Sequence, residues 1–328
     1  MCPRESDARG LGIATYVQAP PGKRRHALIR AGASTRTIVM ATPTGMKLAR
    51  LPRIALVVLF ALALSACGTR LLYERIDTLL YFQLASQVTL DDGQARALRA
   101  SLRELHAWHR GAALPAYAEF LETLADDMAQ PVGAGGIDAA RIALEGLWRD
   151  TVAGVAPTAA RWLAGLDPAQ REEFFAGLAE RDVELRREYC DIGDEERRRN
   201  RERAVVSALG DWVGRLGREQ RTLVREQLRG IDANGCDWIA SRAGFRERLR
   251  QLVDTHAAQP HYEARVARLL MHPEDGWDAA YRARYAANSA VVVTMLAELD
   301  RTLSERQRAR LGAKLRRYAL DFRELAAI

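Results

Sequence analysis

Helical periodicity is the strongest constraint on the fold, because it runs through nearly the whole chain after Cys67. The first stripe of apolar residues, at intervals of three and four, is Leu72, Ile76, Leu79, Leu80 and Leu84. Such residues share one face of a helix, whereas a half-buried strand needs alternation of apolar and polar residues. No segment after Cys67 sustains that alternation. The sequence therefore predicts an all-α fold, a multi-helix antiparallel bundle with long helices.

Prolines and glycines predict interruptions between these helices. Leu114-Pro115 is expected to interrupt a helix, and Pro157 to separate helices at 137–154 and 157–166. Residues 131–136, PVGAGG, form the clearest linker and predict a sub-boundary of the domain at 130–136.

Three further segments carry specific expectations. The first helix, at 72–84, is expected to bury its apolar face against the rest of the domain rather than touch a membrane. Residues 194–203 contain no apolar residue, which predicts a solvated helix or connector with pairs such as Asp194–Arg198 and Glu195–Arg199. The last two apolar stripes are joined by a short loop and predict an antiparallel helix pair.

A secretory signal is predicted at residues 46–66. Lys47, Arg50 and Arg53 precede an uncharged apolar run at 54–64, which ends at small residues and Cys67. A cationic start, a short apolar run and small residues before the cut are typical of signal peptides. The run is too short for a membrane-spanning helix, which needs about 20 residues.

Leu64, Ser65, Ala66 and Cys67 resemble the lipobox of bacterial lipoproteins, residue by residue. The resemblance implies that Cys67 carries lipid, that cleavage precedes it and that 67–328 is the mature periplasmic domain. Gly68, in place of an Asp, implies the periplasmic face of the outer membrane rather than the inner membrane. The alternatives are a plain signal peptide with an accidental cysteine, or a buried core helix.

The position of this signal bears on the start of the chain. A signal peptide is expected close to the N-terminus, so Met46 or Met40 is the expected start rather than Met1. Residues 1–45 are interpreted as an upstream start assigned too early, or as disordered.

Charge excludes one class of partner. Of 49 basic and 42 acidic residues, 10 basic and 2 acidic ones precede Cys67, which leaves 39 basic and 40 acidic residues. The net charge of +7 therefore belongs to the segment predicted to be removed. A mature domain that is close to neutral argues against a nucleic-acid partner.

Cys190 and Cys236 are the two cysteines left for the folded domain. An even pair in an exported, oxidising compartment predicts a disulfide. The alternative is a pair of buried free thiols.

Four predicted helices open with Leu, a capping residue, two variable positions and Gln. They are Leu90 to Gln94, Leu166 to Gln170, Leu216 to Gln220 and Leu303 to Gln307. Such a start is a capping box, in which the cap accepts the third helical N–H and the Gln side chain reaches back to the N–H of the cap. The expected caps with a side-chain acceptor are Asp91, Asp167 and Ser304, whereas Gly217 has none.

Two parts of the sequence resemble known protein families. The four helix starts resemble the Leu-Thr-x-x-Gln motif of small periplasmic stress chaperones, which implies binding of unfolded clients on a concave helical face. The lipobox, Leu71 to Arg75 and 108–117, WHRGAALPAY, together resemble a family of uncharacterised Gram-negative helical lipoproteins. That family implies no known activity, and only the lipidation of Cys67 is carried over.

Catalytic chemistry has little support. His106 and His109 are i, i+3 neighbours and weak metal candidates, but a metal site needs further ligands, and the alternative is a packing histidine. We expect no catalytic residue and no cofactor. The predicted function is a non-catalytic binding, chaperone-like or structural envelope protein, attached to the membrane by its lipid, with unfolded or envelope proteins as partners. The alternative is a periplasmic enzyme acting on cell-envelope material.

Replacement of Cys67 by serine tests the anchor. Cys67→Ser removes the sulfur that would carry the lipid, so labelling by radioactive fatty acid should vanish and the protein should leave the membrane fraction. A mutant that still takes up label would show that the anchor is assigned to the wrong residue.

Overall fold

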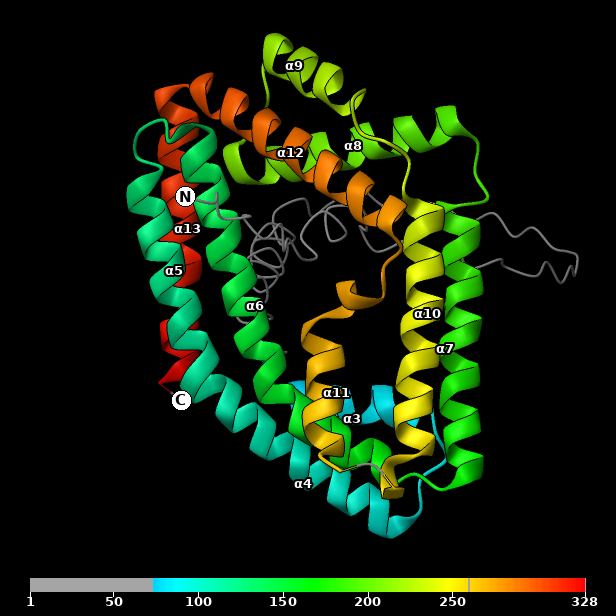
Figure 1. Ribbon diagram of the computed structural model, residues 1–328. Coiled ribbons are helices and arrows are strands. Elements are labelled where there is room, and N and C mark those ends of the chain that lie inside the picture. Colours follow the sequence, from blue (N-terminus) through cyan, green and yellow to red (C-terminus); the bar gives the residue numbers. More distant parts are fainter. Residues whose placement is uncertain (1–72, 259, 328) are drawn as a thin grey trace, which may run out of the picture. The chain divides into compact units, whose positions relative to one another are not determined.

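The computed structural model describes residues 73–258 and 260–327, which contain helices and no strand, so the predicted all-α fold is confirmed. Figure 1 labels most of the elements. The α-helices are α3 (Ile76–Ala85), α4 (Asp92–Trp108), α5 (Leu114–Asp127), α6 (Gly133–Ala164), α7 (Pro168–Tyr189), α8 (Asp194–Val213), α9 (Arg218–Leu228), α10 (Gly235–Asp254), α11 (Tyr262–Met271), α12 (Ala279–Arg301) and α13 (Glu305–Ala326). A π-helical turn, η1 (His109–Ala113), and two 3₁₀ turns, η2 (His256–Ala258) and η3 (Pro273–Gly276), complete the set.

The signal and lipobox at 46–67, and residues 1–45, lie outside the described residues. Among the described helices, none has the length and apolar composition needed to cross a membrane.

Antiparallel pairs organise the long helices. α13 runs along α5, where Arg323 pairs with Glu122 at 2.5 Å (Figure 1). α10 runs along α7, and a disulfide joins Cys190 at the end of α7 to Cys236 at the start of α10. The predicted disulfide is therefore confirmed. α6 contacts both α11 and α12, and α9 packs against α8 and α12.

Buried apolar side chains form three clusters that these pairs enclose. The first cluster joins α6, α7, α10 and α11: Val88, Ala160, Leu163, Leu166, Phe175, Leu249, Val253 and Val266. The second joins α5, α8, α12 and α13: Ala125, Val213, Leu216, Leu299, Leu311 and Leu315. The third joins α8, α9 and α12: Val205, Val224, Leu228 and Met295. Burial of this apolar surface is the main favourable term in folding.

Two predicted interruptions are helical instead, and the third is shorter than predicted. The chain passes from α4 through η1 into α5, and Leu114 N–H donates to His109 O across the wide π turn. Because Pro115 lacks an N–H and its ring crowds the preceding turn, this wider turn accommodates it without ending the helix. Pro157 lies inside α6, with Ala156 and other small residues packed into the core around it. Of the predicted linker at 131–136, Pro131 and Val132 lie in the connection between α5 and α6, whereas Gly133–Gly136 form the first turn of α6.

The predicted antiparallel pairing of the last two helices is wrong. α12 packs against α6 and α9, whereas α13 packs against α5 and α8. Asp300, buried in the last turn of α12, pairs with Arg308 of α13 at 2.8 Å and accepts the N–H of Val132 at 2.8 Å. Arg308 also donates to Met128 O at 3.0 Å. This turn is therefore fastened to the α5–α6 connection, and α13 continues along α5.

The polar segment 194–203 forms the first half of α8, and it is not fully solvated. Arg197 donates to the carbonyls of Cys190 and Ile192 at 3.0 and 2.8 Å, which fastens α8 to the disulfide region. Asp194 pairs with Arg197 rather than with Arg198. A sequence pattern shows charge but does not show which backbone carbonyls lie within reach of a long side chain.

The predicted burial of the first helix is also wrong. None of the ten residues of α3 is buried. Leu79, Leu80 and Phe82 are 42%, 40% and 63% exposed. Periodicity predicted the helix correctly, but the apolar residues of α3 are not buried in the core.

Loss of the disulfide should destabilise the domain strongly. Cys190 and Cys236 are 46 residues apart, and closing such a loop stabilises the folded state by about 4 kcal/mol in the chain-entropy model. Urea denaturation of Cys190→Ser/Cys236→Ser should show this loss, and thiol counting on denatured, unreduced wild type should find neither cysteine free. Equal stability of wild type and the double variant would contradict the expectation.

Candidate functional site

Two helix starts that are distant in sequence meet through their glutamines. Gln94 at the start of α4 and Gln170 at the start of α7 exchange amide hydrogen bonds of 2.8 and 2.7 Å. Each nitrogen also donates to the backbone carbonyl before the partner's Leu: Gln94 to Gly165 O at 2.9 Å, and Gln170 to Thr89 O at 2.8 Å. We call this reciprocal pair the first Gln clasp.

The same arrangement occurs once more between the other two starts. Gln220 of α9 and Gln307 of α13 exchange hydrogen bonds of 2.9 and 3.0 Å. Their nitrogens donate to Thr302 O at 3.0 Å and Arg215 O at 3.2 Å, which again precede the partner's Leu. This is the second Gln clasp, and it repeats the four amide hydrogen bonds of the first.

Capping boxes complete both clasps. Asp91, Asp167 and Ser304 each accept the N–H of the Gln three residues on. In return, each of the four Gln oxygens accepts the cap N–H, at 2.9 to 3.1 Å. At the α9 start only this return bond exists, because Gly217 has no side chain. Each clasp amide therefore uses both its donors and both its lone pairs, which is full satisfaction of a Gln side chain.

The leucines of the four starts explain why Gln170 and Gln220 are buried and Gln94 and Gln307 half-buried. Leu166 is 2% exposed and belongs to the first core cluster, and Leu90 packs against it. Leu216 is 3% exposed and belongs to the second, against which Leu303 packs. A buried Leu directly before the cap pulls the helix start into the core, where unpaired backbone groups would be costly.

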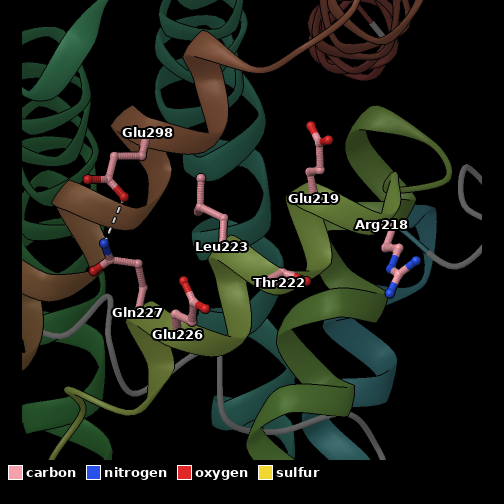
Figure 2. A pocket seen from close by; sticks show the side chains of 7 residues that line it. All are labelled: Arg218, Glu219, Thr222, Leu223, Glu226, Gln227 and Glu298. Atoms are coloured by element: carbon pink, nitrogen blue, oxygen red, sulfur yellow. Dashed lines mark hydrogen bonds between the residues drawn. The ribbon is translucent and has the colours of Figure 1, made fainter.

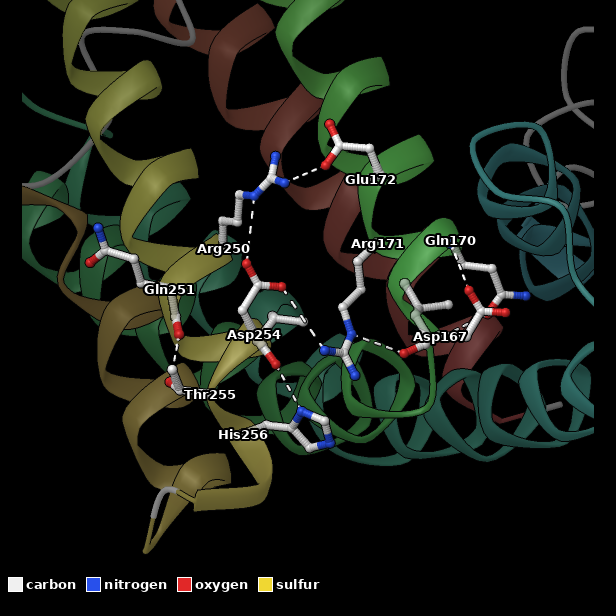
Figure 3. A network of polar contacts seen from close by, with 11 residues as sticks. Asp167, Gln170, Arg171, Glu172, Arg250, Gln251, Asp254, Thr255 and His256 are labelled. Carbon is white, nitrogen blue, oxygen red and sulfur yellow. Dashed lines mark hydrogen bonds and ion pairs between the residues drawn. The ribbon is translucent and has the colours of Figure 1, made fainter.

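Ion pairs surround the start of α7, as Figure 3 shows. Arg171 donates to Leu166 O at 2.9 Å and lies 4.0 Å from Asp254 of α10. Arg250 of α10 lies 3.6 Å from Asp254 and also pairs with Glu172 of α7. These charges fasten the end of α10 to the first clasp, and the paired groups are engaged with one another.

The two candidate metal histidines lie at the junction of α4 and η1. Burial lowers the pKa of both His106 and His109. The His109 ring contacts that of Tyr117 edge-on at 5.7 Å, and Tyr117 hydrogen-bonds Thr151 of α6. No group of three or more His, Cys, Asp or Glu within the described ranges could hold a metal ion.

Residues 108–117, which carried part of the family resemblance, join this junction to α6. A Cβ at Gly154 would lie 2.0 Å from the Trp108 ring, so only glycine fits opposite that ring. With the Tyr117–Thr151 bond, this contact makes the segment a packing element between α4, α5 and α6.

The described surface includes an acidic and a basic open groove. One, of about 560 Å³, lies between α9 and α12 and is lined by Arg218, Glu219, Thr222, Leu223, Glu226, Gln227 and Glu298 (Figure 2). Gln227 donates to Glu298 across it at 2.7 Å. Its three carboxylates oppose one guanidinium, so the groove is acidic.

The second groove, of about 460 Å³, lies between α10 and α11 and is basic. Arg248, Arg265 and Arg268 line it together with His272, against Asp275. Arg268 lies 3.5 Å from Asp275, and Arg248 donates to the carbonyl of Pro273 at 3.3 Å. Part of its positive charge is therefore already paired within the protein.

The first half of α6 has its polarity inverted. Glu145 is 3% exposed and pairs with Arg141 at 2.5 Å. On the same two turns Ile142, Leu144 and Trp148 are 56%, 42% and 49% exposed. Leu144 and Trp148 are i, i+4 neighbours and share one face, with Ile142 on the other side of the helix. Protein surfaces usually expose charged side chains and bury large apolar ones, so the reverse arrangement on α6 is unusual.

A family model matches residues 86–282, more than half of the 328 residues, and describes DUF6279, a family of unknown function. The chain belongs to the DUF6279 family. No curated protein and no solved structure matches the chain. The predicted membership of an uncharacterised family is thus confirmed, whereas the lipobox lies outside the matched span.

The DUF6279 span covers the first Gln clasp, both disulfide cysteines and Gln220, but not Gln307. Sequence reasoning found all four helix starts and treated each as an isolated cap. It missed their pairing, which depends on the tertiary structure. The signal in the sequence that could have indicated this pairing was the Leu before each cap. A buried Leu brings the following Gln toward the interior, where its amide needs hydrogen-bond partners from another helix.

Truncation of a clasp glutamine should be costly. Gln170→Ala leaves Thr89 O and the N–H of Asp167 without partners, so we expect a loss of about 2–3 kcal/mol in unfolding free energy. Gln94→Ala should act alike, and the double variant should cost less than the sum of the two.

Urea denaturation of the two single variants and the double variant measures this coupling. The matched control is Gln251→Ala on exposed α10 surface, which should change stability by no more than about 0.5 kcal/mol. Strictly additive effects of the two clasp variants would show that the glutamines act independently.

Proposed function

We propose that this DUF6279 protein is a lipid-anchored envelope protein that binds partner proteins by contact and catalyses no reaction. The lipobox at 64–67 supports attachment through Cys67, at the periplasmic face of the outer membrane, as the resemblance to bacterial lipoproteins implies. The partners are unfolded or partly folded envelope proteins, which expose apolar segments.

The inverted polarity of α6 carries this proposal. Leu144 and Trp148 form an apolar pair facing solvent, while Glu145 is buried beside its ion-pair partner, the half-buried Arg141. Folding of an isolated domain would favour the reverse arrangement, because buried charges are costly and buried apolar groups are stabilising. An exposed aromatic side chain with an adjacent aliphatic one is a typical anchor for a partner segment.

An aggregation assay tests this function. The soluble form, residues 68–328, should suppress aggregation of an unfolded client at near-stoichiometric ratio without ATP. Leu144→Ser/Trp148→Ser should lose that suppression because the apolar pair is gone, while its thermal unfolding stays close to wild type since both side chains are exposed.

Val183→Ser on α7 is the matched control, since Val183 is 50% exposed but stands outside the α6 pair. It should suppress aggregation as wild type does. Absence of suppression by the wild-type chain, or equal activity of the α6 variant and wild type, would refute the proposed binding function.

A further inference from the structure

α3 presents apolar side chains that remain exposed among the described residues. After Asp77 the helix has no charged residue, and its sequence continues TLLYFQLA. Phe82 and Leu79, which lie three positions apart, are its most exposed large side chains. The segment after the helix is held firmly, because Val88 is 1% exposed in the first core cluster. The end of the helix is thus fixed to the core, while the side chains of Leu79, Leu80 and Phe82 are exposed.

A row of arginines on α4 lies beside this apolar surface. Arg96, Arg99 and Arg103 are exposed and, at i, i+3 and i+7, share one face of the helix. The guanidinium of Arg99 lies 3.8 Å above the centre of the Tyr81 ring, which places this face next to α3. None of the three arginines makes an ion pair with another residue in the described ranges, although Asp92 lies close to their row.

The tether determines what α3 can meet. Ile76 follows Cys67 by nine positions, and even a fully extended chain of that length spans only about 30 Å. If Cys67 is lipidated, α3 remains within that distance of the bilayer surface. Tethering of this kind gives a high effective concentration, so even a weak membrane contact would be populated.

We propose that α3 and the arginine row of α4 form a surface that docks on the anionic bilayer to which the protein is anchored. The side chains of Leu79, Leu80 and Phe82 enter the interface between headgroups and acyl chains, and Arg96 and Arg103 pair with lipid phosphates. Interfacial helices combine these two features, exposed apolar side chains and adjacent basic ones. The inference rests on the proposed lipidation of Cys67.

A spin label on α3 tests this docking in the lipidated protein. With Cys67 acylated and Cys190 bonded to Cys236, Phe82→Cys introduces a single reactive thiol into the mature chain. In vesicles containing anionic phospholipid, the label should be relaxed by oxygen, which concentrates in lipid, more than by a water-soluble nickel chelate. Leu320→Cys on α13, 56% exposed in the parent chain, is the control and should show the aqueous ratio.

Substitution of the arginines provides a second measurement. Arg96→Gln/Arg103→Gln, which keeps the Arg99–Tyr81 contact, should shift the Phe82 label toward the aqueous ratio in anionic vesicles. Two results would overturn the inference while leaving the anchor intact: an aqueous ratio at position 82 in protein that sediments with vesicles, or a label shielded from both reagents by a protein partner. Failure of Cys67 to take up fatty acid would remove the anchor itself, and the inference with it.

Discussion

The buried helix start is the constraint on which the described structure depends. The first N–H groups of a helix and the carbonyls before it have no partner within the helix, and burial without partners is costly. Here the leucine of each start lies in a core cluster or packs against one, and the two Gln clasps provide the missing partners. Each clasp joins one start to another, so satisfying local backbone groups also fixes a tertiary contact.

Each clasp lies next to a different core cluster. The leucines of the first clasp pack in the cluster of α6, α7, α10 and α11. The leucines of the second pack in the cluster of α5, α8, α12 and α13. The disulfide and the Asp300–Arg308 pair act elsewhere, at the α7–α10 junction and at the α12–α13 turn. The disulfide, the ion pair and the glutamine hydrogen bonds thus connect different pairs of helices. Burial of the apolar clusters supplies most of the stability.

Much of this fold was predictable from residue patterns, since periodicity and capping are local properties. The all-α class, the four helix starts and the Cys190–Cys236 bond are examples. The wrong predictions concern the contacts that a residue makes in the folded chain. A π turn accommodates Pro115 without ending the helix, and no residue of α3 is buried. The clasp pairing, the inverted polarity of α6 and the basic row beside α3 became visible only once the helices were placed, because each depends on neighbours distant in sequence.

The wide sequence separation within each clasp has a consequence for folding kinetics. Gln94 and Gln170 are 76 residues apart, and Gln220 and Gln307 are 87 apart. Contacts between such distant residues form only after considerable loop-closure entropy has been lost. The clasps should therefore close late, on the native side of the rate-limiting barrier. Their free energy would then act mainly to slow the opening of the folded domain rather than to speed its formation, which makes the clasps determinants of kinetic lifetime.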